Sequence, residues 1–472
     1  MEPDIWAALL RPDPASDETL PLQLARAIRQ AALAGRLAEG DALPATRACA
    51  DLLGIGRNAV ITAYELLAAE GIITTAQGKR PRIAPLHLPA SPAAPQAIAL
   101  SQRARALPVT PTPHATRMSP GSPDPRLFPA DLWGRALRRA ARHRQDGAEG
   151  YTHFAGLPEL RQVLADHLHR HRGLAVGPDD ILITSGTQAS LTLCAHGFAD
   201  TGARALVENP GYRNARTAFV AAGLDCAPLP VDAQGAAPHL ADFAGAKLVY
   251  VTPSTQYPAG MRMPMARRLA LVAQAKAAGA VVIEDDYDSE FVWHGRGIAA
   301  IGALPDRGGV VTIGSAAKSL LPGLRIGWLV APHGAADGLR QMHRRLGLAA
   351  NVHAQAALAD VMGAGSYRHH IQKISQTYHE RMLTLHAALT NALPDGCALS
   401  LPDGGLQLTV TCPALADDRQ WAAALQALGY GVTALSDYDM TGATKGLVVG
   451  FGLMEPREAK PFARACAAAL PR

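Results

Sequence analysis

The chain has 472 residues, more than the roughly 100–200 of an ordinary domain, so we expect two or three domains. It is 48% hydrophobic and 18% charged, and no apolar run is long enough to span a bilayer. Glu2 and Asp4 stand where a secretory signal would be basic, which argues against such a signal. The six cysteines lie far apart without CxxC spacing, which argues against zinc and dithiol motifs and predicts a reduced, cytoplasmic protein.

Positive charge is concentrated near the N-terminus, although the net charge of +5 is small for this length. Residues 44–83 carry five Arg or Lys against three Asp or Glu, a local balance of +2, whereas the first 43 residues are acidic. Such asymmetry suits a polyanionic partner such as nucleic acid. An ordinary solvated surface is the alternative explanation.

Residues 43–84 carry the pattern of two short helices joined by a tight turn and followed by a hairpin. The first helix is expected over 46–54, with Thr46 as its cap, and the second over 57–69. A β-hairpin with a basic tip is expected over 72–83. This order is typical of a helix-turn-helix whose second helix enters the major groove of DNA.

Five side chains of this block are candidate DNA contacts: Arg47, Arg57, Asn58, Lys79 and Arg80. The two arginines of the helices can pair with phosphates or read guanine, and the asparagine can read adenine or bond a phosphate. The two cations of the hairpin tip would bind the DNA backbone. A small helical domain with ordinary surface arginines shows the same pattern, so the pattern alone leaves DNA binding open.

The block also resembles the GntR-type winged-helix family. The resemblance rests on a leucine-proline start, a first-helix arginine, a glycine turn and the residues before the hairpin: Leu43-Pro44, Arg47, Leu53-Gly54, Arg57-Asn58 and Glu70-Gly71-Ile72. Gly56 stands where the family often has Ser or Thr, and Ile61 where some members have a further DNA-contacting Arg. The resemblance implies a winged helix-turn-helix domain over residues 1–84 that binds a double-stranded DNA operator.

Residues 85–115 are rich in proline, which favours extended chain and predicts an interdomain linker. Beyond it, short apolar runs alternate with helical stretches, the pattern of a parallel sheet covered on both faces. The expected strands are 181–184, 205–207, 248–252, 280–283, 310–313 and 327–330. Long helical patterns and late strands near 405–411 and 446–451 follow, so we expect an α/β fold with a large part over about 116–340 and a small part over about 341–472.

Two of the segments beyond the linker suit an aromatic ligand that bears a phosphate. The strand 181–184 ends in small residues that open a helix, and free N–H groups at a helix start attract phosphate. Asp285 and Tyr287 lie two residues apart at a strand end and therefore face the same side. A carboxylate opposite a pyridinium nitrogen keeps it protonated, and a phenol can bond the ring's 3-oxygen. Because Glu284 and two further aspartates adjoin, an acidic loop or a metal site is the alternative.

Lys318, one of only seven lysines, follows an apolar strand and lies among small residues. A partly desolvated amine has a lowered pKa and can form a Schiff base with an aldehyde. Ser315 and Arg325 would supply phosphate contacts around it. The alternative is a strand-end lysine in a salt bridge. In a fourth segment, Tyr212 follows a strand in a turn and can stack on an aromatic ring.

Together these segments resemble the fold-type I aminotransferases, which depend on pyridoxal 5'-phosphate (PLP), over nearly all of residues 116–472. The resemblance implies that Lys318 is the Schiff-base lysine, Asp285 the pyridinium partner and Tyr287 the donor to the 3-oxygen. It also implies that Tyr212 stacks on the ring. A phosphate cup is implied at Gly186, Thr187, Gln188, Ser315 and Arg325. Tyr151 is implied to reach the phosphate of the partner subunit.

Two places depart from the aminotransferase pattern. Where the family has an Asn in its Asn-Pro-Thr-Gly motif, the chain has Gln256 and Tyr257, and either can contact the ring. Where aminotransferases carry the Arg that holds the substrate α-carboxylate, the chain has Val448. Loss of that cation argues against efficient transamination, unless another cation replaces it. The candidate replacements are Arg213, Lys445 and Arg216, and the first two are also candidate effector contacts.

The order of winged helix, proline linker and aminotransferase-like domain resembles the MocR/GabR-type subfamily of GntR regulators, as do residues 252–258 and 283–291. The resemblance implies a domain-swapped homodimer whose DNA binding responds to an amino-acid-like or vitamin effector. The signal is then a small-molecule amine or the cofactor itself. We therefore expect a PLP-dependent transcriptional regulator with at most weak transaminase activity, without a metal or a membrane partner. The alternative is an active aminotransferase with an appended DNA-binding module.

Overall fold

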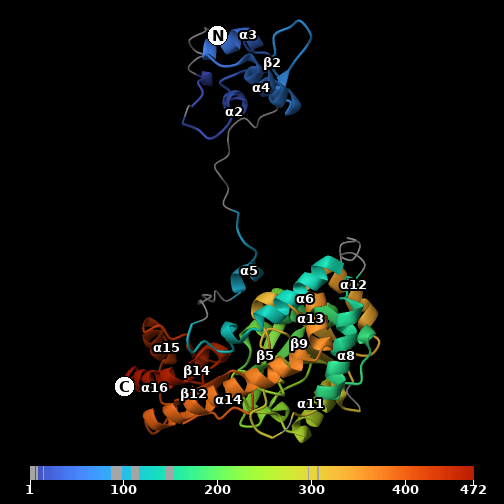
Figure 1. Cartoon of the computed structure of the whole chain (residues 1–472), viewed down its shortest axis with the longest axis vertical. Coiled ribbons are helices and arrows are strands. Elements are labelled where there is room, and N and C mark those ends of the chain that lie inside the picture. The colour runs from blue at the N-terminus through green and yellow to red at the C-terminus, as the bar shows by residue number, and fades with distance from the viewer. Residues whose placement is uncertain are drawn as a thin grey trace. The chain divides into compact units, whose positions relative to one another are not determined.

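The computed structural model describes residues 6, 9–13, 15–86, 98–107, 116–143, 153–295, 297–305 and 308–471. They form two compact units, residues 1–99 and 100–472 (Figure 1). Among these described residues, no helix combines the length and the apolar character that crossing a membrane requires.

In the described residues of the N-terminal unit, three helices pack together with a two-stranded hairpin. Its elements are α2 (Leu20–Leu33), α3 (Thr46–Leu53), α4 (Arg57–Ala69), β1 (Ile73–Thr74) and β2 (Arg82–Ile83). The strands are antiparallel, with Ile73 opposite Ile83. Helix α3 ends at Gly54, whose φ of 66° lies in the left-handed region that favours glycine. The predicted cap is wrong, because Ala45 precedes the helix and Thr46 is its first residue.

Helix α4 is held in place by its buried face and by two polar contacts. Its residues Val60, Ala63, Tyr64 and Leu67 are buried in the core of the unit. The Tyr64 hydroxyl donates to the Pro44 carbonyl at 2.9 Å, which ties the helix to the start of α3. Just beyond the helix, Glu70 accepts from the Arg29 guanidinium of α2, with Nε and Oε2 2.6 Å apart. The opposite face of α4 is therefore presented in a fixed orientation.

The segment predicted as a linker, 85–115, includes residues 87–97 and 108–115, which lie outside the described residues. Between them the short helix α5 (Gln102–Ala106) forms, so the expectation of extended chain is wrong there. The residues from 96 to 107 contain no proline, and the Ser101 hydroxyl caps the helix by accepting from the Ala104 N–H at 3.1 Å.

The second unit is built on an eight-stranded sheet with the order β3-β10-β9-β8-β7-β4-β5-β6. The strands are β3 (Ile181–Thr184), β4 (Arg204–Asn209), β5 (Asp225–Asp232), β6 (Gly235–Ala236), β7 (Ala246–Val251), β8 (Val281–Asp285), β9 (Val310–Ser315) and β10 (Gly327–Val330). The prediction of a wholly parallel sheet is wrong, because β10 is antiparallel to both of its neighbours. The chain between β9 and β10 is too short for the crossover helix that parallel strands require.

Helices cover both faces of the large sheet. They are α6 (Ala130–His143), α8 (Pro158–Arg172), α9 (Thr187–Phe198), α10 (Arg213–Ala221), α11 (Met265–Ala278), α12 (Ala336–Leu346) and α13 (Val352–Gly363). Helices α9, α10 and α12 share one core with Leu182, Leu248 and Ile283. Alternate strand residues, such as Ile183 and Val249, face the opposite side, where α6, α8, α11 and α13 pack. This alternation agrees with the two-sided burial expected from the sequence.

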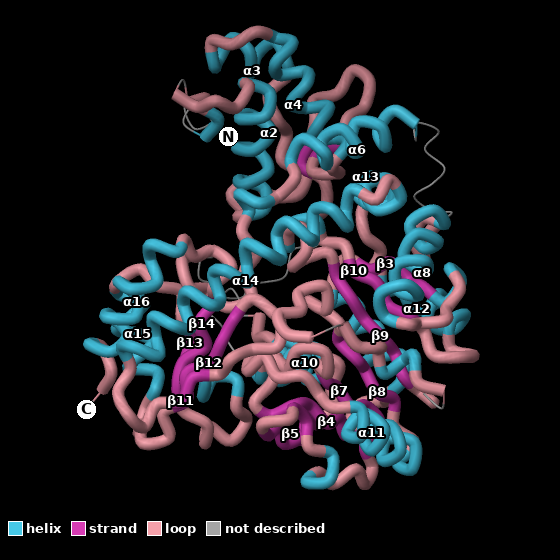
Figure 2. The backbone as a smooth tube through the Cα atoms, turned by 60° about the horizontal axis from the view of Figure 1, so that its bottom comes forward, coloured by secondary structure: helices cyan, strands magenta, loops and turns pink. Residues whose placement is uncertain are grey.

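A smaller antiparallel sheet with the order β11-β12-β14-β13 follows the long helix α14 (Ser366–Ala392), which runs from the large sheet to the small one (Figure 2). Its strands are β11 (Ala398–Leu399), β12 (Gln407–Thr411), β13 (Thr433–Ala434) and β14 (Gly446–Gly450). Helices α15 (Asp418–Ala427) and α16 (Ala459–Ala468) complete its core with α14. The two strands predicted near 405–411 and 446–451 are its centre.

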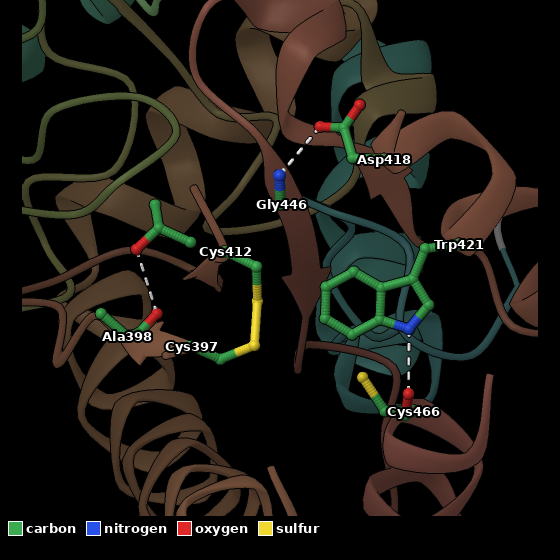
Figure 3. Close-up of a disulfide and its surroundings, with 8 residues drawn as sticks. Cys397, Ala398, Cys412, Asp418, Trp421, Gly446 and Cys466 are labelled. Carbon is green, nitrogen blue, oxygen red and sulfur yellow. Dashed lines mark hydrogen bonds between the residues drawn. A yellow bond between two sulfur atoms is a disulfide. The ribbon is translucent and has the colours of Figure 1, made fainter. Parts of the chain in front are cut away.

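A disulfide joins Cys397 to Cys412 in the small sheet, so the prediction of a fully reduced chain is wrong (Figure 3). The two cysteines are 15 residues apart in sequence, yet their Cα atoms lie 4.5 Å apart. The reason is the register of β11 and β12, which sets Ala398 opposite Thr411 and brings the two flanking cysteines face to face. Spacing motifs such as CxxC do not detect a pair made by strand pairing.

Candidate functional site

A cavity of about 520 Å³ lies at the carboxyl ends of β3, β4, β8 and β9. Ligands of open α/β sheets bind at this edge. Of the predicted cofactor contacts, those that line the cavity are Gly186, Thr187, Gln188, Tyr212, Tyr257, Asp285, Tyr287, Ser315, Lys318 and Arg325. Tyr151 lies outside the described residues. The four sequence segments singled out above therefore meet in one place.

One end of the cavity is suited to an anion. Gly186 precedes α9 with a φ of 109°, a left-handed conformation that favours glycine, and the first N–H groups of the helix are free there. The Arg325 guanidinium lies beside Gly186, 3.9 Å from where a Cβ would be. Arg325 itself has a φ of 53°, which is uncommon for a residue with a side chain. A cation and a helix N-terminus thus converge, as a phosphate group requires.

Asp285, the last residue of β8, offers the cavity an unsatisfied carboxylate oxygen. The side chain is 2% exposed, and its Oδ2 accepts from the Tyr250 hydroxyl at 2.8 Å. Its Oδ1 is buried and has no hydrogen-bond partner among the described residues. Burial raises the pKa of Asp285 to about 7. A protonated ring nitrogen of a ligand would supply the missing donor and the missing positive charge.

Lys318 reaches the cavity from the turn after β9. Its Nζ donates to the Gly121 carbonyl at 2.5 Å. Burial lowers the pKa of the Lys318 amine, although the Asp288 and Asp285 carboxylates oppose this shift. A lowered pKa increases the fraction of neutral amine, which is the form that attacks an aldehyde.

Tyrosine rings form a side of the cavity. The ring of Tyr257 lies 5.4 Å from that of Tyr212 and 6.0 Å from that of Tyr287, centroid to centroid, with an edge-to-face arrangement in both pairs. The Tyr287 hydroxyl donates to the Thr255 carbonyl at 3.1 Å. Gln256 does not line the cavity, because its amide donates to the Pro210 and Tyr257 carbonyls at 2.9 and 2.7 Å. Of the two residues at this position, Tyr257 is the one at the cavity.

Val448 is fully buried in β14 and lies in a small apolar cluster. Its neighbours there are Leu435 and Tyr438, and Tyr257 packs against the cluster. The residue expected where aminotransferases hold the substrate carboxylate is therefore surrounded by apolar and aromatic side chains.

Neither predicted effector contact, Arg213 or Lys445, lines the cavity. The Arg213 guanidinium lies over the Tyr438 ring, 4.7 Å from its centroid, and 4.0 Å from the Asp437 carboxylate. The carbonyl of Lys445 accepts from the Cys412 N–H at 3.0 Å, beside the disulfide. Arg213 is thus adjacent in sequence to two lining residues, whereas Lys445 belongs to the small sheet.

Sequence reasoning missed several polar residues of the site. Asn214 and Thr217, three residues apart on α10, line the cavity, and this helical spacing was an available signal. Tyr250 was interpreted only as part of a buried strand, and its bond to Asp285 appears only in the folded sheet. Asp288, beside the predicted pair, was considered only as part of an acidic cluster.

The rest of the acidic segment has structural partners. The Glu284 carboxylate accepts from the Ile301 and Gly302 N–H groups at 2.8 and 3.1 Å. Asp286 forms a buried ion pair with Arg172, with Oδ2 and Nε 2.8 Å apart. In the described part of the chain, no three His, Cys, Asp or Glu residues are grouped to hold a metal ion.

In the N-terminal unit, all five predicted DNA contacts are exposed. Arg57 and Asn58 are the first two residues of α4, and Arg47 is the second residue of α3. Lys79 and Arg80 lie in the loop between β1 and β2. None of the five takes part in an ion pair or side-chain hydrogen bond with another described residue, so all are available to phosphate and base edges.

Family models match both units. The model described as "Bacterial regulatory proteins, gntR family" matches residues 20–83, and "Aminotransferase class I and II" matches 121–446. Among solved structures, the kynurenine aminotransferase of Pyrococcus horikoshii is 25% identical, with a TM-score of 0.72, over 78% of this chain and 96% of that one. The expected fold, a fold-type I aminotransferase domain after a winged helix-turn-helix, is confirmed.

Two curated relatives have the same two-part composition. The probable rhizopine catabolism regulatory protein MocR of Rhizobium meliloti is 33% identical over 94% of this chain and 92% of its own length. The pyridoxine biosynthesis transcriptional regulator PdxR of Corynebacterium glutamicum is 35% identical over 93% of each chain. The chain belongs to the MocR-type GntR regulators: it is a DNA-binding transcriptional regulator that carries a domain of the class I and II aminotransferase family.

Proposed function

We propose that the second unit binds PLP at Lys318, and that the cofactor, or an amine that reacts with it, changes the affinity of the winged helix for its operator. The observation that carries the proposal is that one cavity holds the Lys318 amine, the unsatisfied Asp285 oxygen, the Arg325 cation and the N-terminus of α9. When bound, PLP supplies an aldehyde that condenses with amines.

Each residue has a distinct part in this proposal. The N-terminus of α9 and Arg325 bind the phosphate, and Asp285 holds a proton on the ring nitrogen. Tyr212 stacks on the ring, and Tyr287 orients its 3-oxygen. The family resemblance adds that Tyr151 completes the phosphate site of the partner subunit in a domain-swapped homodimer.

Sensing, rather than turnover, is the role that Val448 supports. An amino acid bound as in aminotransferases would place its carboxylate against the buried apolar cluster of Val448 and Leu435. The Arg213 guanidinium lies over the Tyr438 ring of this cluster, but it is already 4.0 Å from the Asp437 carboxylate. Burying an unpaired carboxylate is strongly unfavourable. The ligand we propose is therefore a small amine, with Arg213 as the candidate contact for an anionic group, or the vitamin cofactor itself. An active aminotransferase is the second candidate, favoured by the presence of the lysine and its pyridinium partner.

The test measures operator affinity and turnover on the same preparation. Operator duplexes are selected from a random pool, and the anisotropy of labelled DNA is recorded with full-length protein without PLP, with PLP, and with PLP plus a series of primary amines. We expect a change in affinity of about 5- to 150-fold, the usual size of coupling between two sites. Lys318→Ala should abolish the response to amines. Affinity that ignores PLP and amines, together with fast transamination, would favour the enzyme instead.

A further inference from the structure

Three buried polar atoms without partners lie near Lys318, on residues that do not line the cavity described above. They are Oδ2 of Asp288 and both amide atoms of Gln407, none of which has a hydrogen-bond partner among the described residues. Asp288 is 1% exposed and Gln407 is fully buried. Asp288 follows β8 of the large sheet, whereas Gln407 begins β12 of the small one. Unsatisfied buried groups are costly, so a group that needs them is expected between the two sheets.

Two glycines lie directly against these groups, where any side chain would crowd them. A Cβ on Gly121 would lie 3.2 Å from the Lys318 Nζ and 3.6 Å from the Gln407 Oε1. A Cβ on Gly405 would lie 2.8 Å from the Asp288 Oδ2 and 3.5 Å from the Gln407 Nε2. The lysine amine, the carboxylate and the amide are therefore grouped around these two glycines, and we call this group the lysine recess. The amine already points into it, since it donates to the Gly121 carbonyl at 2.5 Å.

The lysine recess is complementary to an ammonium group. The Gly121 carbonyl, Asp288 Oδ2 and Gln407 Oε1 are all acceptors, and one of them is a carboxylate. Burial lowers the pKa of Lys318, and of the charges that oppose this shift Asp288 is the strongest, ahead of Asp285. Burial likewise raises the pKa of Asp288 well above its ordinary value, and Lys318 is the charge that most opposes that shift. Because a ring nitrogen would occupy Asp285, Asp288 is the carboxyl group left to stabilise the lysine as an ammonium.

We propose that Asp288 is a positioning residue: together with Gln407 and the Gly121 carbonyl, it receives the Lys318 amine as an ammonium whenever another amine takes its place on the cofactor. The inference rests on the proposed function and deepens it. A lysine held as ammonium is a poor base, so an amine captured in this way is retained rather than processed. Holding the lysine as an ammonium therefore favours retention of the captured amine, which a sensor requires, over its further reaction, which an aminotransferase requires.

The exchange balances without a further reactant. The bond between Lys318 Nζ and the cofactor carbon breaks, and a bond between that carbon and the incoming nitrogen forms. With both amines written in their protonated forms, two protons pass from the incoming ammonium to the leaving lysine nitrogen. No electron is gained or lost. The equilibrium therefore depends on how well the protein holds the protonated lysine.

The test measures that equilibrium directly. Full-length protein loaded with PLP is titrated with propylamine, reduced with borohydride, and weighed by intact mass spectrometry, which gives the fraction of chains with the cofactor still attached to Lys318. For Asp288→Asn we expect the propylamine concentration at half exchange to rise about tenfold, since an adjacent charge shifts an amine by about one pKa unit or more. Asp403→Asn is the matched control, because this carboxylate accepts from the Arg262 N–H at 3.0 Å and does not border the recess.

Two further variants distinguish charge from structure. The double change Asp288→Asn and Gln407→Glu restores a carboxylate from the opposite wall and should return half exchange toward the wild-type concentration. Gln407→Glu alone adds a second carboxylate and should lower it. Equal half-exchange concentrations in wild type and Asp288→Asn, or a Gln407→Glu protein that exchanges no more easily than wild type, would overturn the inference. A wild-type chain that binds no PLP at all would instead overturn the proposed function.

Discussion

Asp285 should make the cofactor-free domain less stable as the pH rises. Burial raises its pKa to about 7 from an ordinary value of 3.8. Between these two values the folded chain binds more protons than the unfolded chain, so the stability present below the lower value is lost as the pH rises through the upper one. A pKa difference of about three units lowers the free energy of unfolding by about 4 kcal/mol at pH 8 and by about 1.5 kcal/mol at pH 5.

Asp285→Asn should remove this loss, because the amide carries no charge and its oxygen can still accept from the Tyr250 hydroxyl. For a domain of roughly 370 residues, an unfolding entropy of about 2 cal/mol/K per residue converts 4 kcal/mol into a rise in Tm of about 5 °C. The variant should therefore melt about 5 °C above wild type at pH 8, and about 2 °C above it at pH 5.

Calorimetry of both proteins without PLP, at the two pH values, provides the measurement. The comparison between proteins cancels other buried carboxyls with raised pKa values on which Asp285 does not act, such as Glu290. Saturating PLP should reverse the order at pH 8, since only the wild type offers a carboxylate to the ring nitrogen. A difference in Tm that is the same at pH 5 and pH 8 would refute the assignment of the raised pKa to Asp285.

Three further outcomes test the remaining assignments. Lys318→Ala should lose the adduct that borohydride traps with PLP while keeping its circular dichroism spectrum; trapping at another lysine would contradict the role of Lys318. Arg57→Ala should weaken operator binding by about 1–3 kcal/mol. Replacing both Lys79 and Arg80 with Ala should weaken binding to every DNA sequence equally and reduce the slope of log affinity against log salt concentration by about 2. An unchanged salt dependence would show that the loop between β1 and β2 does not contact DNA. Reducing the Cys397–Cys412 disulfide should destabilise the small sheet by up to about 3 kcal/mol, because it closes a loop of about 15 residues; an unchanged thermal transition in dithiothreitol would show that the bond contributes nothing.

Local patterns were sufficient wherever neighbouring residues determine the structure. The bounds of α4 follow from the spacing of Val60, Ala63 and Leu67, and the six expected strands of the large sheet all form. Pairing partners were less predictable. The antiparallel β10 and the missed strand β5, which contains two prolines and is mostly half-buried, depend on contacts with distant strands. The disulfide was missed for the same reason, since strand register, not spacing, brings its cysteines together.

The same distinction between local patterns and distant contacts applies to the residues of the site. Asp285 and Tyr287 were found because two residues at a strand end share one side, and Lys318 because it follows an apolar strand. Tyr250 and Gln407 were missed because each acts on a residue of another strand or of the other sheet. Gln256 and Tyr257 are adjacent, and only the folded turn, in which the Gln256 amide bonds to backbone carbonyls, places the tyrosine at the cavity.

Arg325 combines a side chain that suits an anion with a backbone that suits glycine. Its left-handed φ of 53° costs on the order of 1 kcal/mol relative to glycine. Selection for thermal stability alone would therefore favour Arg325→Gly. Variants ranked by melting temperature would include proteins that resist heat but lack the arginine proposed to bind phosphate. Persistence of the arginine at this position among thermostable variants is thus a direct readout of whether the cavity is under functional selection.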